Sequence, residues 1–454
     1  MSGRPPFRRA GLAATLALTV AGIPALATAT HDTSPASAAA QASPDGPLNV
    51  GYFTQWGIYG RNFQVKDLDT SGAAESLTHI NYAFGNVNEA GRCFIDNTPG
   101  EGDAWADYQR PVPAELSVDG VADMWGEPLN GNFGQLRKLK ESHPDLRVNI
   151  SLGGWSWSTY FSNAALTPQS REQFVESCID LYIKGNLPIL DGGSGGEGVA
   201  AGVFDGIDLD WEWPNWPGDV GNVVRAEDRK NFTELVKEFR RQLDALGQQT
   251  GRHYELTAFL PANPGAMDAG FEGKKIFRYL DFATVQGYDF HGTWEATTNQ
   301  QSALFEPADA PVTPDFTLDR AVQEWLARGA PRDKLVAGIP YYGQGWTGVT
   351  GGDDGLFQPA SGAAPATFQA GIEDWKVLRT LLAQGYTLYR DTDAGHAWLF
   401  DGTTFWTYDD PEVLAQKTSY IRDQALAGAM VWSLDGDDAN ATLTKTIWAG
   451  LHGD

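Results

Sequence analysis

The chain has 454 residues and a formal net charge of −25, with 58 acidic against 33 basic side chains. This excess of acidic groups would repel a phosphate backbone, so we expect no nucleic-acid partner. The length is too great for one small core, but it accommodates a barrel of about 250 residues with large insertions. The 16 Trp and 15 Tyr residues are more than a core of branched aliphatics requires. We therefore expect some aromatic side chains to face a ligand.

The N-terminal stretch "MSGRPPFRRAGLAATLALTVAGIPALATAT" has a basic start, an apolar centre and small residues at its end. This order is typical of a secretory signal and not of a membrane anchor. The Ala-, Ser- and Pro-rich residues that follow show no periodicity. We therefore expect residues 1–45 to lie outside the fold and residues 46–454 to form one large domain. The expected protein is secreted, monomeric and without a membrane-spanning segment.

Eight short runs rich in β-branched and aromatic residues predict buried strands. Helical patterns separate them, and the clearest covers residues 225–247 with apolar side chains at helical spacing. Strand and helix alternating eight times predict an α/β fold, a (β/α)8 TIM barrel. The eight runs are "LNVGYF", "LTHINYAF", "LRVNISLGG", "GVFDGIDLDW", "YELTAFLPA", "FATVQGYDF", "KLVAGIPYY" and "AGAMVWSL".

Two intervals between the predicted strands are longer than a helical return needs. The first, residues 86–132, follows the second strand, and the second lies between strands 7 and 8. We predict a small inserted α+β lobe at residues 343–408. Because insertions after barrel strands rise above the active-site face, both intervals should wall a cleft. Cys93 and Cys178 are candidates for a disulfide in an oxidising compartment, although the sequence alone does not fix their geometry.

Acidic and apolar residues alternate in "DGIDLDWEWP" at residues 205–214. In a strand, Asp208, Asp210 and Glu212 project to one side, and the apolar residues between them project to the other. We expect the acidic set to enter the barrel and Glu212 to lie at its mouth, where barrel enzymes carry out chemistry.

Two other interpretations of this run are a solvated acidic turn and a Mg²⁺ or Zn²⁺ site. The regular alternation disfavours the turn. Separated histidines and the lack of an "HExxH" pairing disfavour the metal, so we expect neither metal nor cofactor. Burial and like charge raise the pKa of stacked carboxyls, which suits Glu212 to general acid catalysis. A secreted, Trp-rich protein with such an acid is predicted to be a glycosidase.

The same run resembles the "DGxDxDWExP" signature of glycoside hydrolase family 18, the chitinases. "SLGG" at 151–154, "QGYDFHG", "GIPYYGQGW" and "MVWSLDGD" resemble further strands of that family. An inserted lobe is typical of its deep-cleft bacterial branch. The resemblance implies a retaining, substrate-assisted mechanism on β-1,4 links between N-acetylglucosamine units of chitin, in which the acetamido oxygen of the substrate replaces an enzyme nucleophile.

The resemblance also implies a role for each catalytic residue. Glu212 acts as the general acid and then as the base, and Asp210 orients the acetamido N–H and stabilises an oxazolinium ion. Asp208 shares charge or a proton with Asp210. Tyr288 donates a hydrogen bond to the acetamido oxygen.

Around these groups we expect Asp289 to hold the sugar and Trp432 to form the floor of the pocket. Tyr52 and Phe84 are candidates for lining the pocket, although packing alone also explains them. Gln286 stands where the family usually has Met, and it changes the polarity beside the acetamido group. Candidates for stacking on sugars along the cleft are Trp155, Trp157, Trp125, Trp294 and Trp346.

Two alternative functions remain open from the sequence. An endo-acting N-acetylglucosaminidase on protein-linked glycans would share the fold and the acid. A non-catalytic chitin-binding lectin would usually lack the acid, whereas Glu212 is present here.

Overall fold

The structure is a computed structural model, which describes residues 46–453. The predicted secretory segment, residues 1–45, lies outside the described residues. Within 46–453 no helix is both long and apolar enough to cross a bilayer.

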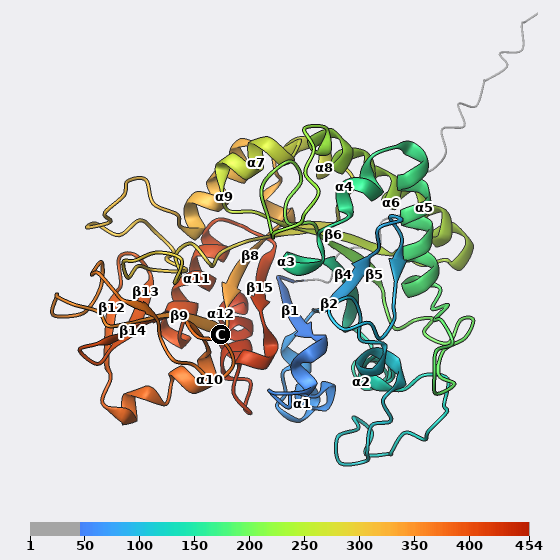
Figure 1. Cartoon of the computed structure of the whole chain (residues 1–454), viewed down its shortest axis with the longest axis horizontal. Helices are drawn as coiled ribbons and strands as arrows, with labels where there is room; N and C mark the ends of the chain where they lie inside the picture. The colour runs from blue at the N-terminus through green and yellow to red at the C-terminus, as the bar shows by residue number, and fades with distance from the viewer. Residues whose placement is uncertain (1–45, 454) are drawn as a thin grey trace, which may run out of the picture. The chain divides into compact units, whose positions relative to one another are not determined.

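Eight parallel strands close into a barrel, with β1 pairing both β15 and β2 (Figure 1). The helices that follow the strands lie outside the barrel, so the predicted (β/α)8 fold is confirmed. All eight strands coincide with the runs identified in the sequence. In spatial order they are β1 (Leu48–Thr54), β15 (Gly428–Trp432), β8 (Leu335–Pro340), β7 (Phe282–Val285), β6 (Glu255–Leu260), β5 (Gly206–Asp210), β4 (Arg147–Gly153) and β2 (His79–Val87).

The longest helix, α6 (Asp228–Thr250), shows why these segments become helical. Phe232, Val236 and Phe239 recur at helical spacing and are buried, and the helix ends before Gly251, which adopts a left-handed conformation with φ 71°. The other α-helices of five or more residues are α1 (Val65–Thr70), α2 (Gly131–Ser142), α4 (Phe161–Ala165), α5 (Pro168–Cys178), α7 (Pro264–Gly270), α9 (Leu318–Ala327), α11 (Pro411–Asp423) and α12 (Thr442–His452).

A second sheet is inserted between β8 and β15. Its strand order is β10-β9-β14-β13-β12, with β11 paired to β9, and it spans Tyr342–Tyr408. The neighbouring strands are antiparallel, and one short helix, α10 (Trp375–Leu378), accompanies them. The strands are β9 (Tyr342–Thr347), β10 (Gly362–Ala363), β11 (Ile372–Asp374), β12 (Thr387–Asp391), β13 (His396–Phe400) and β14 (Thr404–Tyr408).

The long segment after β2 is tied to the helical layer by a disulfide. Cys93, on the short strand β3 (Cys93–Phe94), is bonded to Cys178 at the end of α5, 85 residues later in the chain. The same segment contains a π-helical turn, η3 (Trp105–Gln109), and packs against α2.

Candidate active site

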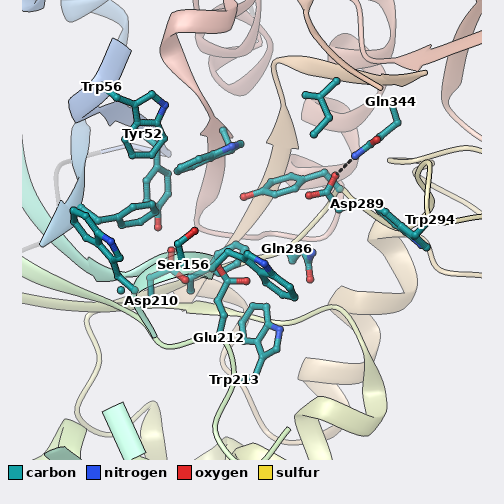
Figure 2. A pocket seen from close by; sticks show the side chains of 18 of the residues that line it. Tyr52, Trp56, Ser156, Asp210, Glu212, Trp213, Gln286, Asp289, Trp294 and Gln344 are labelled. Atoms are coloured by element: carbon teal, nitrogen blue, oxygen red, sulfur yellow. Dashed lines mark hydrogen bonds between the residues drawn. The ribbon is translucent and has the colours of Figure 1, made fainter. Parts of the chain in front are cut away.

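A cavity of about 900 Å³ opens at the carboxyl ends of the barrel strands. Asp210 enters it from the end of β5 and Glu212 from two residues beyond. Tyr52 and Trp432 enter it from β1 and β15, and Gln286 enters it from the position directly after β7. Figure 2 shows Glu212 between Tyr52 and Trp56 on one side and Asp289, Gln344 and Trp294 on the other. This is the end of the barrel at which parallel-strand enzymes place their chemistry.

The carboxyl groups of Asp210 and Glu212 form one coupled pair. Burial raises the pKa of Glu212 to about 8, and repulsion from Asp289 acts in the same direction. Burial, followed by the charges of Glu212 and Asp208, raises the pKa of Asp210 well above its ordinary value. The two carboxyls also share a hydrogen bond. The pair therefore holds a proton near neutral pH, and this proton belongs to the pair and not to one residue.

Asp208 lies fully buried below this pair and accepts three hydrogen bonds. Tyr52 Oη and Ser151 Oγ each donate over 2.8 Å, and Thr257 Oγ1 donates over 2.6 Å. Burial raises the pKa of Asp208, whereas the three donors oppose that rise by stabilising the carboxylate. Three fixed donors from β1, β4 and β6 hold Asp208 in one orientation beneath Asp210.

The end of β4 approaches the acidic strand unusually closely, and Gly153 makes this possible. Its φ is 107°, and a Cβ atom at this position would lie 2.3 Å from the carbonyl oxygen of Asp210. Only glycine therefore allows the backbone of β4 to pass at this distance.

Tyr288 and Asp289 follow β7 and line the same cavity as the pair. The hydroxyl of Tyr288 lies 4.0 Å from the sulfur of Met430, and burial raises its pKa well above the ordinary value, so it remains a proton donor. Asp289 adopts a left-handed φ of 54°, which Asp tolerates better than most residues. Its Oδ1 accepts a hydrogen bond of 2.8 Å from Gln344 Nε2 of the inserted sheet (Figure 2).

Aromatic rings line most of the remaining wall. The ring of Trp432 stacks on Phe84 with centroids 5.6 Å apart and meets Tyr52 edge-on at 5.3 Å. Trp155 is 52 % exposed and Trp294 is 63 % exposed, so both present free indole faces at the rim. Flat apolar faces around a few polar groups suit the binding of sugar rings.

The family described as "Glycosyl hydrolases family 18" matches residues 49–437. The chain belongs to this family. The resemblance seen in the sequence motifs is therefore confirmed over nearly all of the described residues.

Three relatives illustrate the family 18 match. Chitinase 63 of Streptomyces plicatus is 39 % identical over 415 residues, which cover 90 % of this chain and 61 % of that protein. The catalytic domain of the psychrophilic chitinase B from Arthrobacter TAD20 is 47 % identical with a TM-score of 0.86, covering 90 % of this chain and 96 % of that one. A mutant of catalytic domain 2 of the Ostrinia furnacalis Group II chitinase, solved with penta-N-acetylchitooctaose, is 25 % identical with a TM-score of 0.72, covering 90 % and 97 %. The chain spans about three fifths of the length of Chitinase 63 and of Chitinase C from Streptomyces lividans.

Most of the site residues predicted for this family 18 chain meet in the one cavity. Asp208 lies beneath it, as described above, and Trp125 lies outside its wall. The indole of Trp125 is 69 % exposed on the long segment after β2, with its ring 6.2 Å from that of Trp105. The predicted residues that line the cavity are Glu212, Asp210, Tyr288, Asp289, Gln286, Trp432, Tyr52, Phe84, Trp155, Trp157 and Trp294.

The prediction that Trp346 stacks on a sugar is wrong. Trp346 is fully buried on β9, where it packs 5.9 Å from Phe405 and donates from Nε1 to the carbonyl of Glu295. Strand alternation directs this side chain into the interior of the inserted sheet. Trp346 therefore belongs to the small hydrophobic core of the inserted sheet and not to the wall of the cavity.

Eight lining residues were not predicted from the sequence, namely Trp56, Gly100, Gly153, Ser156, Trp213, Phe259, Gln344 and Ile372. Trp56 comes from the turn η1 (Gln55–Ile58) after β1, Trp213 follows the acid directly, and Phe259 lies on β6. Gln344 comes from β9 of the inserted sheet. Of these residues, Trp213 could have been predicted to line the site, because it lies within the motif "DGIDLDWEWP" directly after Glu212. Among residues 46–453, no group of three or more His, Cys, Asp or Glu side chains is arranged to hold a metal ion.

Proposed function

We propose that this protein is a chitinase that hydrolyses β-1,4 links between N-acetylglucosamine units with retention of configuration. The observation that carries this proposal is the Asp210–Glu212 pair, which holds a proton near neutral pH in an aromatic-lined cavity. Family membership supports it, as do relatives named chitinases. No cofactor is required for this chemistry.

In the proposed reaction Glu212 protonates the leaving glycosidic oxygen. The acetamido oxygen of the substrate attacks the anomeric carbon, and Glu212 then takes a proton from the water that opens the oxazolinium ion. Oδ1 of Asp210 is buried and has no hydrogen-bond partner among the described residues, which leaves it available to accept from the acetamido N–H. A carboxylate at this position stabilises the positive charge that develops on the oxazolinium ring.

Tyr288 and Asp208 complete the catalytic set. Among the described residues, the Tyr288 hydroxyl donates only to the weak acceptor Met430 sulfur, at 4.0 Å, so we infer that it donates to the acetamido oxygen of the substrate. Asp208, held by its three donors, keeps negative charge beneath Asp210 and raises the pKa of that residue.

The aromatic side chains are proposed as binding positions for sugars. Trp432 forms the floor beneath the reacting ring with Tyr52 and Phe84 against it. Asp289 and Gln286 offer polar contacts, and Trp155, Trp157 and Trp294 form the rim. Trp125 extends this surface beyond the cavity together with Trp105. The Ostrinia furnacalis domain solved with penta-N-acetylchitooctaose supports an oligosaccharide as the ligand.

The protein is further proposed to be secreted and to act as a monomer. The N-terminal sequence supports secretion, and the Cys93–Cys178 disulfide fits an oxidising compartment.

The test of the proposed function is a comparison of three substrates. We expect cleavage of N-acetylglucosamine oligomers, and no cleavage of fully deacetylated glucosamine oligomers, because these lack the acetamido nucleophile. Preferential release of glycans from a glycoprotein would favour the endo-N-acetylglucosaminidase alternative. Binding of chitin without cleavage of any substrate would favour the lectin.

A further inference from the structure

The peptide groups of Glu212 are held by side chains and not by a neighbouring strand. β5 ends at Asp210, which pairs with Gly153 of β4, so Glu212 lies two residues beyond the sheet. The N–H of Glu212 donates to Ser158 Oγ over 2.8 Å, and its carbonyl accepts from Asn222 Nδ2 over 3.0 Å. Both main-chain groups of the proposed acid are therefore satisfied by side chains from two separate loops.

Ser158 connects this peptide to the strand end behind it. The side chain is fully buried, and Oγ lies 2.9 Å from the carbonyl of Gly154 and 3.2 Å from the carbonyl of Asp210. Its single hydrogen is directed to these carbonyls while its oxygen accepts from Glu212. One hydroxyl thus fixes the backbone on both sides of the bend between the two catalytic carboxylates.

Asn222 is in turn fixed by the residue that follows Ser158. Thr159 Oγ1 donates to Asn222 Oδ1 over 3.3 Å, and the N–H of Val223 donates to the carbonyl of Thr159 over 3.1 Å. Gly218 also passes close to Glu212, since a Cβ atom there would lie 2.2 Å from its carbonyl oxygen. The loop after β4 and the loop after β5 therefore close around the Glu212 backbone.

We propose that Ser158 and Asn222 are positioning residues that set the orientation of Glu212. The inference rests on the proposed function, because it assigns Glu212 as the acid. Neither side chain lines the cavity, so neither contacts substrate in this arrangement. Loss of either contact leaves a main-chain group of Glu212 without its partner and lets the carboxyl turn away from Asp210.

The test compares Ser158→Ala and Asn222→Ala with the wild-type protein on N-acetylglucosamine oligomers. Displacement of a catalytic group by about 1 Å costs on the order of a hundredfold in rate, so we expect kcat to fall by about tenfold to a hundredfold. KM should change by less than about threefold, because the sugar-binding surface is untouched. The alkaline limb of the kcat profile should move to lower pH, because a Glu212 carboxyl that reaches solvent loses the burial that raises its pKa.

Ser117→Ala is the matched control. Ser117 is also fully buried, and its Oγ donates to Asp119 over 2.7 Å, but it lies in the long segment after β2 and outside the cavity wall. The Ser117→Ala variant should be less stable than the wild type, but the dependence of its kcat on pH should be unchanged. If Ser158→Ala and Asn222→Ala behave like Ser117→Ala, the two residues are merely structural and the inference is wrong.

A ¹³C NMR titration of the Glu212 carboxyl, identified by its loss in Glu212→Gln, separates this inference from the proposed function. The midpoint should fall in Ser158→Ala and in Asn222→Ala and stay unchanged in Ser117→Ala. A wild-type protein that cleaves no oligomer would overturn the proposed function, yet the titration would still decide whether these two residues position Glu212. Unchanged midpoints in both variants would overturn the inference even if hydrolysis is found.

Discussion

Nε2 of Gln344, on the inserted sheet, donates a hydrogen bond of 2.8 Å to Oδ1 of Asp289 at the mouth of the barrel (Figure 2). The lobe therefore does more than wall the cleft, because it supplies a donor to a carboxylate that faces Glu212. Burial raises the pKa of Asp289, and the Gln344 donor opposes that rise.

Gln344→Ala should lower kcat/KM for N-acetylglucosamine oligomers by about tenfold to a hundredfold, because a hydrogen bond to a charged group contributes about 1.5–3 kcal/mol. Steady-state kinetics on purified protein measures this effect. Gln369→Ala, at an exposed position of the same lobe, is the control and should behave as the wild type. Equal kinetics for the two variants would show that the hydrogen bond from Gln344 to Asp289 makes no contribution to catalysis.

The elevated pKa of Glu212 also predicts how stability depends on pH. The ordinary pKa of 4.5 applies to the unfolded chain and about 8 to the folded one, so the folded protein binds more protons between these values. This contribution to stability is therefore present at low pH and is lost as pH rises towards 8. Glu212→Gln removes the cost of ionising a buried carboxyl at high pH. The melting temperature of this variant should therefore exceed that of the wild type by about 2 °C or more at pH 8 but not at pH 4.

Thermal unfolding of both proteins across this pH range provides the measurement. Glu197→Gln replaces an exposed glutamate and should leave the dependence of the melting temperature on pH unchanged. If the difference in melting temperature between Glu212→Gln and the wild type did not depend on pH, the pKa of Glu212 would not be raised in the folded protein.

A buried ion pair between Lys417 of α11 and Asp409 gives a prediction about stability alone. Both side chains are fully buried, Lys417 Nζ donates to the carbonyl of Ser302 over 2.6 Å, and Ser302 Oγ donates to Asp409 over 2.8 Å. Lys417→Met should cost about 3–5 kcal/mol in the free energy of unfolding, because it leaves a buried carboxylate without its partner. Lys237→Met removes an exposed pair with Glu234 and should cost less than about 1 kcal/mol in the same denaturant titration.

The disulfide between Cys93 and Cys178 should stabilise the fold without affecting the chemistry. It closes a loop of 85 residues, and a cross-link of this length contributes about 2–4 kcal/mol by restricting the unfolded chain. The double variant Cys93→Ala, Cys178→Ala should unfold at lower denaturant concentration and retain the kcat of the wild type. A large loss of kcat at a temperature where the variant is folded would show that the segment after β2 is coupled to the site.

The barrel was predictable because each strand is a continuous buried run bounded by turn residues. The inward direction of the acidic side chains on β5 was predictable as well. Asp208 and Asp210 alternate with apolar residues, and this alternation determines which side chains enter the barrel. The boundaries of α6 were predicted three residues early at each end, because helical periodicity does not mark the terminal turns.

The rest of the site depends on contacts between segments far apart in the chain. Trp346 was misassigned because nothing in its local sequence distinguishes the two faces of β9. Gln344, two residues earlier, reaches Asp289 only because the sheet lies beside the loop after β7. Ser158 likewise acts on a residue 54 positions later, which no local pattern indicates.

The most direct test of the central claim is hydrolysis of N-acetylglucosamine oligomers by the wild type and by Glu212→Gln, with the anomer of the product followed by ¹H NMR. The account predicts that the wild type releases the β-anomer first and that Glu212→Gln loses at least about a hundredfold in kcat, as expected for removal of a general acid. Release of the α-anomer would contradict the substrate-assisted mechanism. Undiminished activity of Glu212→Gln would contradict the assignment of the acid.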